Sequence, residues 1–310
     1  MRVFIILFVG LFNFVEANAK SLGRTGNPKD TITTTASGYL LAGGSTDVDE
    51  AMHWFLEKSG GGDIVIIRAS GGAGYNDYLY KLFPVNSVET LLLNSREEAI
   101  LPETASILAK AEAIFIAGGD QWNYINYWTG TAVQFALQEA IRRRKIPIGG
   151  TSAGLAILGQ FVFDAKMDGI SSAEAMADLQ SPKISISKDF VSIPLLKHII
   201  TDSHYTQRNR MGRHIAFLFR IQQAYGIKAK GIGIDEKTAL ALNADGSAKV
   251  FGNAAVYFLQ LVSTKADSVP LAKIYKIMAS KEGTAIASLK ECFKKSDVYY
   301  FIQNKELVKR

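Results

Sequence analysis

The sequence predicts an α/β protein built on a mostly parallel sheet with helices on both faces and extra β strands in its C-terminal part. Three observations predict this fold class. Apolar runs alternate with helical segments between residues 38 and 150, as expected when crossover helices join parallel strands. Three of these runs end in paired glycines, at 43–44, 118–119 and 149–150. After residue 231, closely spaced strand patterns replace the alternation.

The first part of the chain contains five buried strand patterns. They cover residues 38–44, 63–72, 90–94, 113–119 and 146–150. Between the first two, residues 47–60 place Met52, Phe55 and Leu56 at helical spacing and end in glycine. Residues 121–145 predict a mostly helical segment whose cationic last turn suits the helix dipole. Ligands of such sheets bind beyond the carboxyl ends of the strands, where the glycine pairs lie.

The C-terminal part predicts further strands. Residues 231–252 indicate two strands joined by an Asn-x-Asp-Gly turn, and strands follow at 255–262 and 296–302. They are expected either to extend the same sheet or to build a small antiparallel layer. Because no convincing linker is present, residues 37–310 are predicted to form a single domain after a loose segment at 20–36.

Residues 1–19 have the features of a secretory signal peptide. Arg2 precedes an apolar run, and Ala17-Asn18-Ala19 fits the small-x-small cleavage pattern. We therefore expect a secreted or periplasmic protein without stable membrane insertion after cleavage. Its one cysteine, Cys292, cannot form an internal disulfide, so stability must come from the core.

Charge gives no indication of a nucleic-acid partner. The formal net charge of +6 is spread along the chain. The basic runs at 142–145 and 294–296 are short, and we interpret them as solvated faces.

Residues 150–154, Gly-Thr-Ser-Ala-Gly, match the nucleophile-elbow pattern. Ser152 would lie on a sharp turn between a strand and a helix, where the N–H of Ala153 can point at a developing oxyanion. The pattern leaves two interpretations open, a catalytic serine and a tightly packed turn.

A nucleophilic serine needs a base and an acid that orients it. The chain has four histidines, His53, His198, His204 and His214. The first, second and fourth lie in apolar or helical segments and are predicted to be structural. His204 follows a short apolar stretch in a loop, where functional groups concentrate; a capping-loop histidine is the alternative. Asp235 and Glu236, after a later strand, are the candidate acids.

The sequence contains no motif that is typical of other enzyme classes or of metal and nucleotide sites. The order serine, histidine, acid differs from that of lipase-like hydrolases. Nucleotide-binding glycine loops, a zinc-protease helix motif and cysteine pairs are absent from the sequence. We therefore expect neither a metal nor a cofactor.

Four ordered motifs together resemble the cyanophycinase and aspartyl-dipeptidase serine peptidases. They are AGGDQ (117–121), GGTSAG (149–154), DSHYTQRNRMGR (202–213) and GIGIDEKTA (231–239). The resemblance extends over roughly residues 37–260 and favours the cyanophycinase branch. It implies a sheet related to class I glutamine amidotransferases, with serine in place of their cysteine, and a homodimer. Residues 37–310 would then be a single peptidase domain.

The resemblance also implies roles for individual residues. Ser152 matches the nucleophile, His204 the base and Glu236 the acid, although Asp235 could be confused with it. Gly119 and Ala153 match the oxyanion donors. The positions that match the substrate groove are Gln121, Asp202, Ser203, Arg208, Arg210 and Arg213. For the three arginines, salt bridges to acidic neighbours are the alternative to carboxylate recognition.

The implied function is that of a secreted exopeptidase. It would hydrolyse the aspartate backbone of cyanophycin to β-aspartyl-arginine dipeptides. Two positions depart from the family pattern: Ser203 replaces a glutamine and Tyr205 a frequent phenylalanine. A polar loop at 164–188 is expected to be a lid or rim. A peptidase acting on other aspartyl or isoaspartyl peptides, and a non-catalytic peptide-binding protein, are the alternatives.

Overall fold

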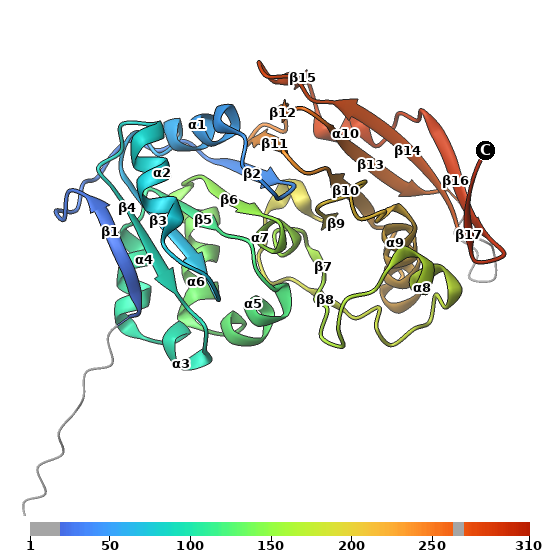
Figure 1. The fold of residues 1–310 in the computed structure, drawn as a ribbon, viewed down its shortest axis with the longest axis horizontal. Coiled ribbons are helices and arrows are strands. Elements are labelled where there is room, and N and C mark those ends of the chain that lie inside the picture. Colours follow the sequence, from blue (N-terminus) through green and yellow to red (C-terminus); the bar gives the residue numbers. More distant parts are fainter. Residues whose placement is uncertain (1–18, 263–269) are drawn as a thin grey trace, which may run out of the picture.

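The computed structural model describes residues 19–262 and 270–310, whose strands form two sheets (Figure 1). The strands of the first sheet are β1 (Ser21–Gly26), β2 (Gly38–Ala42), β3 (Asp63–Arg68), β4 (Ser87–Leu92), β5 (Ala113–Ile116), β6 (Ile148–Thr151), β11 (Thr238–Asn243), β12 (Ala248–Gly252) and β15 (Thr284–Ile286). Their spatial order is β1-β4-β3-β5-β6-β2-β11-β12-β15. Apart from Ala19, the predicted signal peptide at 1–19 lies outside the described residues.

The centre of the first sheet is parallel. Strands β4, β3, β5, β6 and β2 run in one direction, while β1, β11, β12 and β15 pair antiparallel at its sides. The helices that join the parallel strands are α1 (Asp49–Glu57), α2 (Gly74–Leu82), α3 (Arg96–Ala99), α4 (Pro102–Lys110), α5 (Gln121–Trp128) and α6 (Ala132–Glu139). The predicted fold class, a mostly parallel sheet with added C-terminal strands, is confirmed.

Helices cover both faces of this parallel centre. Leu40 and Ile66 share a buried cluster with α1 and α2. Their chain neighbours Leu41 and Ile67 share another with α4, α5 and α6. Successive side chains of a strand point to opposite faces, so a continuous apolar run is what a strand covered on both sides requires.

The second sheet holds most of the C-terminal part. Its strands are β7 (Phe161–Phe163), β8 (Ile186–Lys188), β9 (Ile199–Asp202), β10 (Lys230–Ile234), β13 (Ala255–Leu261), β14 (Leu271–Met278), β16 (Val298–Gln303) and β17 (Glu306–Lys309). Helices α8 (Ser172–Ala177) and α9 (Met211–Tyr225) pack on one face, where Tyr257 and Leu259 lie. Ile232 and Phe258 share a cluster with residues of the first sheet. The two short helices α7 (Ala153–Ala156) and α10 (Leu289–Cys292) complete the elements used below.

The prediction of two strands over 231–252 is wrong. The segment contains β10, β11 and β12, and only the last two are joined by the predicted turn. Between β10 and β11, residues Asp235 to Lys237 carry the chain from the second sheet to the first, and Lys237 has a left-handed φ of 51°. Both expected outcomes for the later strands occur, because β11 and β12 extend the first sheet and β13 builds an antiparallel layer in the second.

The helical segment predicted over 121–145 is divided. Helices α5 and α6 are separated at Thr129 to Thr131, where Gly130 has a φ of 69°. A π-helix at Ala140–Arg144 then ends at Lys145, which is also left-handed. Glycine adopts such a conformation at little cost, so Gly130 allows the chain to break between α5 and α6. The apolar periodicity of the segment gives no sign of this break.

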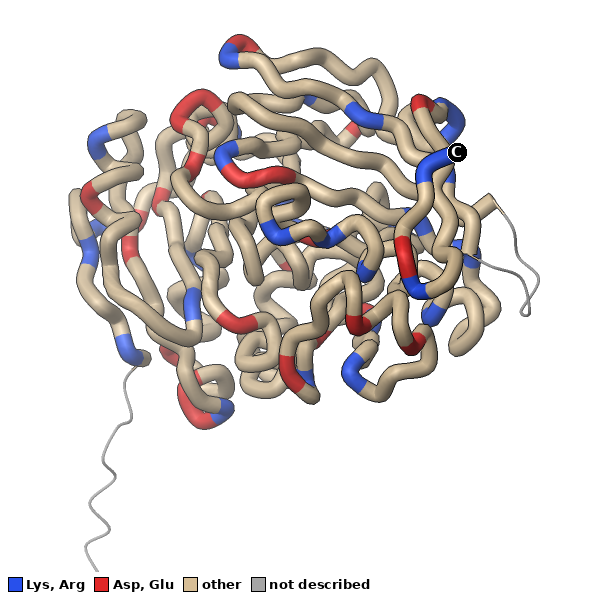
Figure 2. The backbone as a smooth tube through the Cα atoms, turned by 45° about the vertical axis from the view of Figure 1, so that its right-hand side comes forward, with Lys and Arg blue, Asp and Glu red and all other residues tan. Residues whose placement is uncertain are grey.

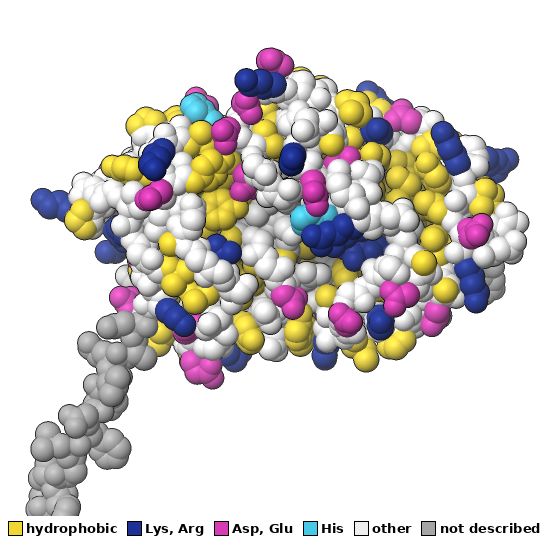
Figure 3. Space-filling model, in the orientation of Figure 1, with side chains coloured by type: hydrophobic (Ala, Val, Ile, Leu, Met, Phe, Trp, Pro, Cys, Tyr) yellow, Lys and Arg dark blue, Asp and Glu magenta, His cyan; other side chains and the backbone are white. Residues whose placement is uncertain are grey.

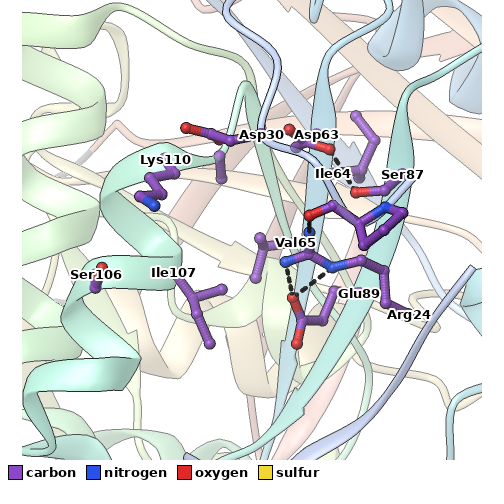
Figure 4. A pocket seen from close by; sticks show the side chains of 12 residues that line it. Arg24, Asp30, Asp63, Ile64, Val65, Ser87, Glu89, Ser106, Ile107 and Lys110 are labelled. Carbon is purple, nitrogen blue, oxygen red and sulfur yellow. Dashed lines mark hydrogen bonds and ion pairs between the residues drawn. The ribbon is translucent and has the colours of Figure 1, made fainter. Parts of the chain in front are cut away.

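Part of the segment expected to be loose is ordered. Residues Ser21–Gly26 form β1, which pairs antiparallel with β4. The Arg24 guanidinium donates to Glu89 on β4, with an Nε–Oε2 distance of 3.1 Å. Figure 4 shows these two side chains pointing toward each other at a pocket that Asp63 and Lys110 also line. The polar strand pattern lacks a buried face, which explains why the sequence does not reveal this strand.

None of the helices in residues 19–262 and 270–310 is both long and apolar enough to span a membrane. Basic and acidic positions are interspersed around the view in Figure 2.

Candidate active site

Ser152 lies on a strained turn between β6 and α7. Its φ and ψ are 53° and −115°, a backbone conformation that residues other than glycine rarely adopt. A methyl group added to Gly154 would lie 2.1 Å from the carbonyl oxygen of Ile116, and one added to Gly150 would lie 2.6 Å from Gly154. The small residues of the elbow are therefore required by backbone packing, and the turn presents the serine hydroxyl beyond the end of the strand.

His204 lies against this serine. Its Nε2 is 2.7 Å from Ser152 Oγ. The His204 N–H donates to the Gly43 carbonyl at 2.8 Å. A methyl group on Gly44, whose φ is 100°, would lie 2.4 Å from the imidazole Cε1. The glycine pair after β2 thus leaves the space that the imidazole occupies.

The structure separates the two candidate acids. Glu236 Oε1 is 2.6 Å from His204 Nδ1. Asp235 instead accepts hydrogen bonds from the backbone N–H and hydroxyl of Thr206, at 2.9 and 2.7 Å, and from the Ala255 N–H at 3.2 Å. Asp235 therefore ties the loop after β9 to the second sheet, and Glu236 is the carboxylate that meets the histidine.

The surroundings of His204 favour a neutral imidazole. Burial lowers its pKa, the hydrogen bond to Glu236 raises it, and the nearby guanidinium groups of Arg208 and Arg210 lower it again. The pKa ends below the usual 6.5. A neutral imidazole can accept a proton from the Ser152 hydroxyl, so at neutral pH His204 is in the state that a general base needs.

Two backbone N–H groups beside the serine have no partner among the described residues. They belong to Gly119, in the loop after β5, and to Ala153, the first residue of α7. A methyl group on Gly118 would lie 3.4 Å from the Ser152 Cβ, and one on Gly119 would lie 2.5 Å from the Tyr124 hydroxyl oxygen. The loop after β5 therefore passes close to Ser152. Residue 119 is a glycine because Tyr124 leaves no room there for a side chain.

Asp202 anchors two of the three arginines. Arg213 donates to it at 2.8 and 2.7 Å, and Arg210 at 2.9 Å. Burial alone would raise the pKa of Asp202, but the two guanidinium groups outweigh it and lower the pKa to about 2. For Arg210 and Arg213, the salt-bridge alternative describes the geometry, because their charges are balanced by a buried carboxylate.

Ser152, the two backbone donors and the Asp202 ion pairs line one small pocket, of about 60 Å³, whose lining residues do not include His204 and Glu236. Near the middle of the face in Figure 3, a histidine lies between acidic and basic side chains. The lining residues predicted from the sequence are Gly119, Gln121, Ser152, Ala153, Asp202, Ser203, Arg208, Arg210 and Arg213. Arg208 is exposed and makes no ion pair within residues 19–262 and 270–310, so its charge is available to a ligand. The Gln121 amide donates to the Phe163 carbonyl at 3.3 Å.

Sequence reasoning missed other parts of this region. Phe163, Ala156 and Thr201 also line the pocket. Ser70, in the loop after β3, has its Oγ 3.4 Å from a methyl group placed on Gly119. The signal for this loop was present, since the run at 63–72 also ends in a glycine pair.

The segment 164–188 is partly regular, although a polar loop was expected. It contains α8, which begins with a capping box at Ser171 and Glu174, and ends in β8. The Ile170 carbonyl accepts a hydrogen bond from Arg213 at 3.1 Å, and Ser172 donates to the Asn209 carbonyl. The segment thus helps to hold Arg213 in place through the Ile170 carbonyl. Its role as a lid or rim stays a prediction.

The remaining histidines lie apart from this pocket. His214 is buried on α9, where burial lowers its pKa to about 4, and His53 packs edge-on against Phe83. His198 lies at the other end of β9 from His204. Within the described part of the chain, no group of three or more histidine, cysteine, aspartate or glutamate residues is arranged to hold a metal ion.

Comparison with known proteins gives the family. The model of peptidase family S51 matches residues 74–250. The cyanophycinase of Synechococcus elongatus is 28% identical over 209 residues, which cover 65% of this chain and 60% of that protein. The cyanophycinase of Trichormus variabilis is 25% identical over 232 residues, covering 72% and 73%.

A solved structure supports the fold. The crystal structure of a peptidase from an acI-B1 actinobacterium superimposes with a TM-score of 0.55 and 17% identity, covering 82% of this chain and 97% of that one. At this identity the likeness concerns the fold alone. The family match, which covers more than half of this chain, shows that the chain belongs to peptidase family S51.

Proposed function

We propose that the protein is a serine exopeptidase of cyanophycinase type, which hydrolyses the aspartate backbone of cyanophycin to β-aspartyl-arginine dipeptides. One observation carries the proposal: Ser152, His204 and Glu236 form a hydrogen-bonded chain, at 2.7 and 2.6 Å, on a strained strand-to-helix turn. The family membership and the cyanophycinase relatives support it.

In the first half of the reaction, Ser152 Oγ attacks the carbonyl carbon of the scissile amide. His204 Nε2 takes the hydroxyl proton as the new C–O bond forms. Glu236 accepts a hydrogen bond from Nδ1–H, which fixes the tautomer and stabilises the imidazolium. Because the histidine is neutral before the attack, no proton has to leave it first.

The negative charge on the carbonyl oxygen then needs donors. The N–H groups of Gly119 and Ala153, which have no partner in the described part of the chain, are the candidates, and losing one such donor typically costs about 10²–10³-fold in rate. His204 next gives its proton to the leaving amine, and the C–N bond breaks to leave an ester on Ser152. Water, activated by the same histidine, hydrolyses this ester and regenerates the enzyme.

Arg208 is the group we propose for substrate selection. Each unit of the polymer presents a carboxylate on its arginine, and the fork of a guanidinium suits carboxylate recognition. Arg210 and Arg213 are already paired with Asp202, so in this proposal they shape the pocket wall and Arg208 binds the ligand.

Ser203 favours a second candidate, a peptidase of the same mechanism that acts on other aspartyl or isoaspartyl peptides. Its hydroxyl oxygen lies 3.4 Å from an Arg210 nitrogen and lines the pocket. Serine is shorter than the glutamine of the family pattern, so it reaches less far toward a substrate. A different side-chain group on the aspartyl unit would then fit this wall.

The proposal includes export to the periplasm or the medium, cleavage after Ala19 and assembly into a homodimer. The charged start, apolar run and Ala17-Asn18-Ala19 motif support export. N-terminal sequencing of protein recovered from each fraction tests it, because retention of residues 1–19 would contradict cleavage. Sedimentation of the purified protein tests the dimer.

The deciding experiment is the product profile of the purified protein with cyanophycin, beside Ser152→Ala. Release of β-aspartyl-arginine by the wild type alone is expected. If a fluorophosphonate labels Ser152 while cyanophycin stays intact, the second candidate is favoured, and a panel of α- and β-aspartyl dipeptides identifies the substrate. Equal activity in Ser152→Ala would refute the serine mechanism.

A further inference from the structure

A second cavity lies at the end of β9 opposite to Ser152. It has a volume of about 550 Å³ and is lined by residues before β9, at the start of β10 and around α10. Lys230, the first residue of β10, pairs in register with Ile199, the first residue of β9. The four residues of β9 span roughly 13 Å at the usual rise per residue, so this cavity is separate from the catalytic pocket.

The floor of the cavity is apolar. Ile199, Leu289 and Phe293 line it and are all buried. The Lys230 ammonium lies 4.8 Å from the centre of the Phe293 ring. A ligand that enters would therefore meet hydrocarbon surface below and charge above, and the volume is in the range of small-molecule sites, about 300–1,000 Å³.

The rim of the cavity is cationic. Lys197, Lys230 and Lys290 line it. Burial lowers the pKa of Lys230, and the positive charges of three neighbours lower it further; these are Lys273, Lys290 and Lys294. The short basic run at 294–296 is thus part of a larger cluster, which the chain assembles from segments far apart in sequence.

The carboxylates near the cluster are outnumbered by its lysines. Asp245 lines the cavity and accepts hydrogen bonds from the Ser247 N–H and hydroxyl, at 2.8 and 2.7 Å, which lower its pKa, so its negative charge offsets one of the three lysine charges there. Glu291 pairs with Lys294 at 2.6 Å. Lys197, Lys230 and Lys290 make no ion pair within residues 19–262 and 270–310. Like charges that converge on a partly desolvated cavity repel each other, and a bound anion would relieve this repulsion.

We propose that this cavity binds an organic phosphate, a group with two or more negative charges joined to an apolar ring. Several lysines at one rim match a multiply charged anion better than a single carboxylate, since each ammonium contributes a charge-assisted hydrogen bond. The buried floor at Ile199, Leu289 and Phe293 suits the ring. Nothing in this proposal depends on the peptidase reaction.

The test is isothermal titration of the full-length protein at low ionic strength with ADP, inorganic pyrophosphate and adenosine as probes. We expect saturable binding of one ADP per chain, weaker binding of pyrophosphate and none of adenosine. In the double variant Lys230→Met and Lys290→Met, affinity for ADP should fall at least about tenfold, because two charge-assisted contacts are lost. Methionine keeps the unbranched chain over Phe293.

The matched control is Lys81→Met with Lys110→Met, which removes the same charge from other surfaces. It should bind ADP as the wild type does, and so should Arg208→Gln at the catalytic pocket. Absence of saturable binding to the wild type, or equal loss in the control, would overturn the proposal. Pyrophosphate binding as tightly as ADP would overturn the organic part of it. The double variant should melt no lower than the wild type, since it removes repulsion, and this shows that it is folded.

Discussion

The imidazole of His204 occupies the space that a side chain on Gly44 would need. A methyl group on Gly44 would lie 2.4 Å from the imidazole Cε1 and 2.5 Å from Nε2. The same glycine has a φ of 100°, and its carbonyl accepts a hydrogen bond from the Lys237 N–H at 3.1 Å. The loop after β2 therefore sets the position of the base and holds the chain just after Glu236.

Gly44→Ala should displace the imidazole from Ser152. We expect kcat to fall by about 10²-fold, the usual effect of a small misplacement of a reacting group. Rates of cyanophycin or dipeptide hydrolysis measure this. Gly169→Ala is the matched control, since a methyl group there meets nothing within 4 Å. An active Gly44→Ala enzyme would mean that the base is positioned from elsewhere.

Replacing the two neighbouring acids should give different results. Glu236→Gln removes the charge beside His204 Nδ1, so kcat should fall by roughly 10²–10⁴-fold with little change in stability. Asp235→Asn puts an amide N–H beside either the Thr206 donors or the Ala255 N–H, and should lower the free energy of unfolding by about 1–3 kcal/mol. Kinetics and urea denaturation of both variants separate the roles. The reverse pattern would assign the acid to Asp235.

Asp235 and Glu236 mark the limit of what the sequence predicts about the site. Buried apolar runs that alternate with helical segments correctly predicted the parallel strands, since a strand covered on both faces must be apolar throughout. Nothing local distinguishes Asp235 from Glu236, because the direction of each side chain depends on where the chain leaves β10 for the other sheet. The same long-range switch hid the third strand in 231–252. The cationic cavity was hidden for a related reason, as its lysines come from the segment before β9, from β10 and from α10.

The acid limb of the pH profile should report His204. Its pKa is lowered, so kcat/KM should be constant around pH 7 and fall only below the usual value of 6.5. Arg208 is one cause of the lowering, because a positive neighbour disfavours the imidazolium. Arg208→Gln should therefore move the acid limb to higher pH. The pH dependence of kcat/KM for both enzymes checks this, and a limb that moves to lower pH would contradict the electrostatic argument.

Asp202 should stabilise the fold, because its carboxylate pairs with Arg210 and Arg213. Asp202→Asn leaves the buried Arg213 without its counter-charge, so we expect a loss of about 3–5 kcal/mol in the free energy of unfolding and a smaller loss from Arg210→Met. The folded-state pKa of Asp202, about 2, lies below its ordinary 3.8. Its stabilising contribution is therefore complete above pH 4 and is lost as the pH falls toward 2. Urea denaturation at several pH values tests both points: the wild type should lose stability over this interval, and Asp202→Asn should lose less. Equal acid sensitivity of the two proteins would assign the loss to other carboxylates.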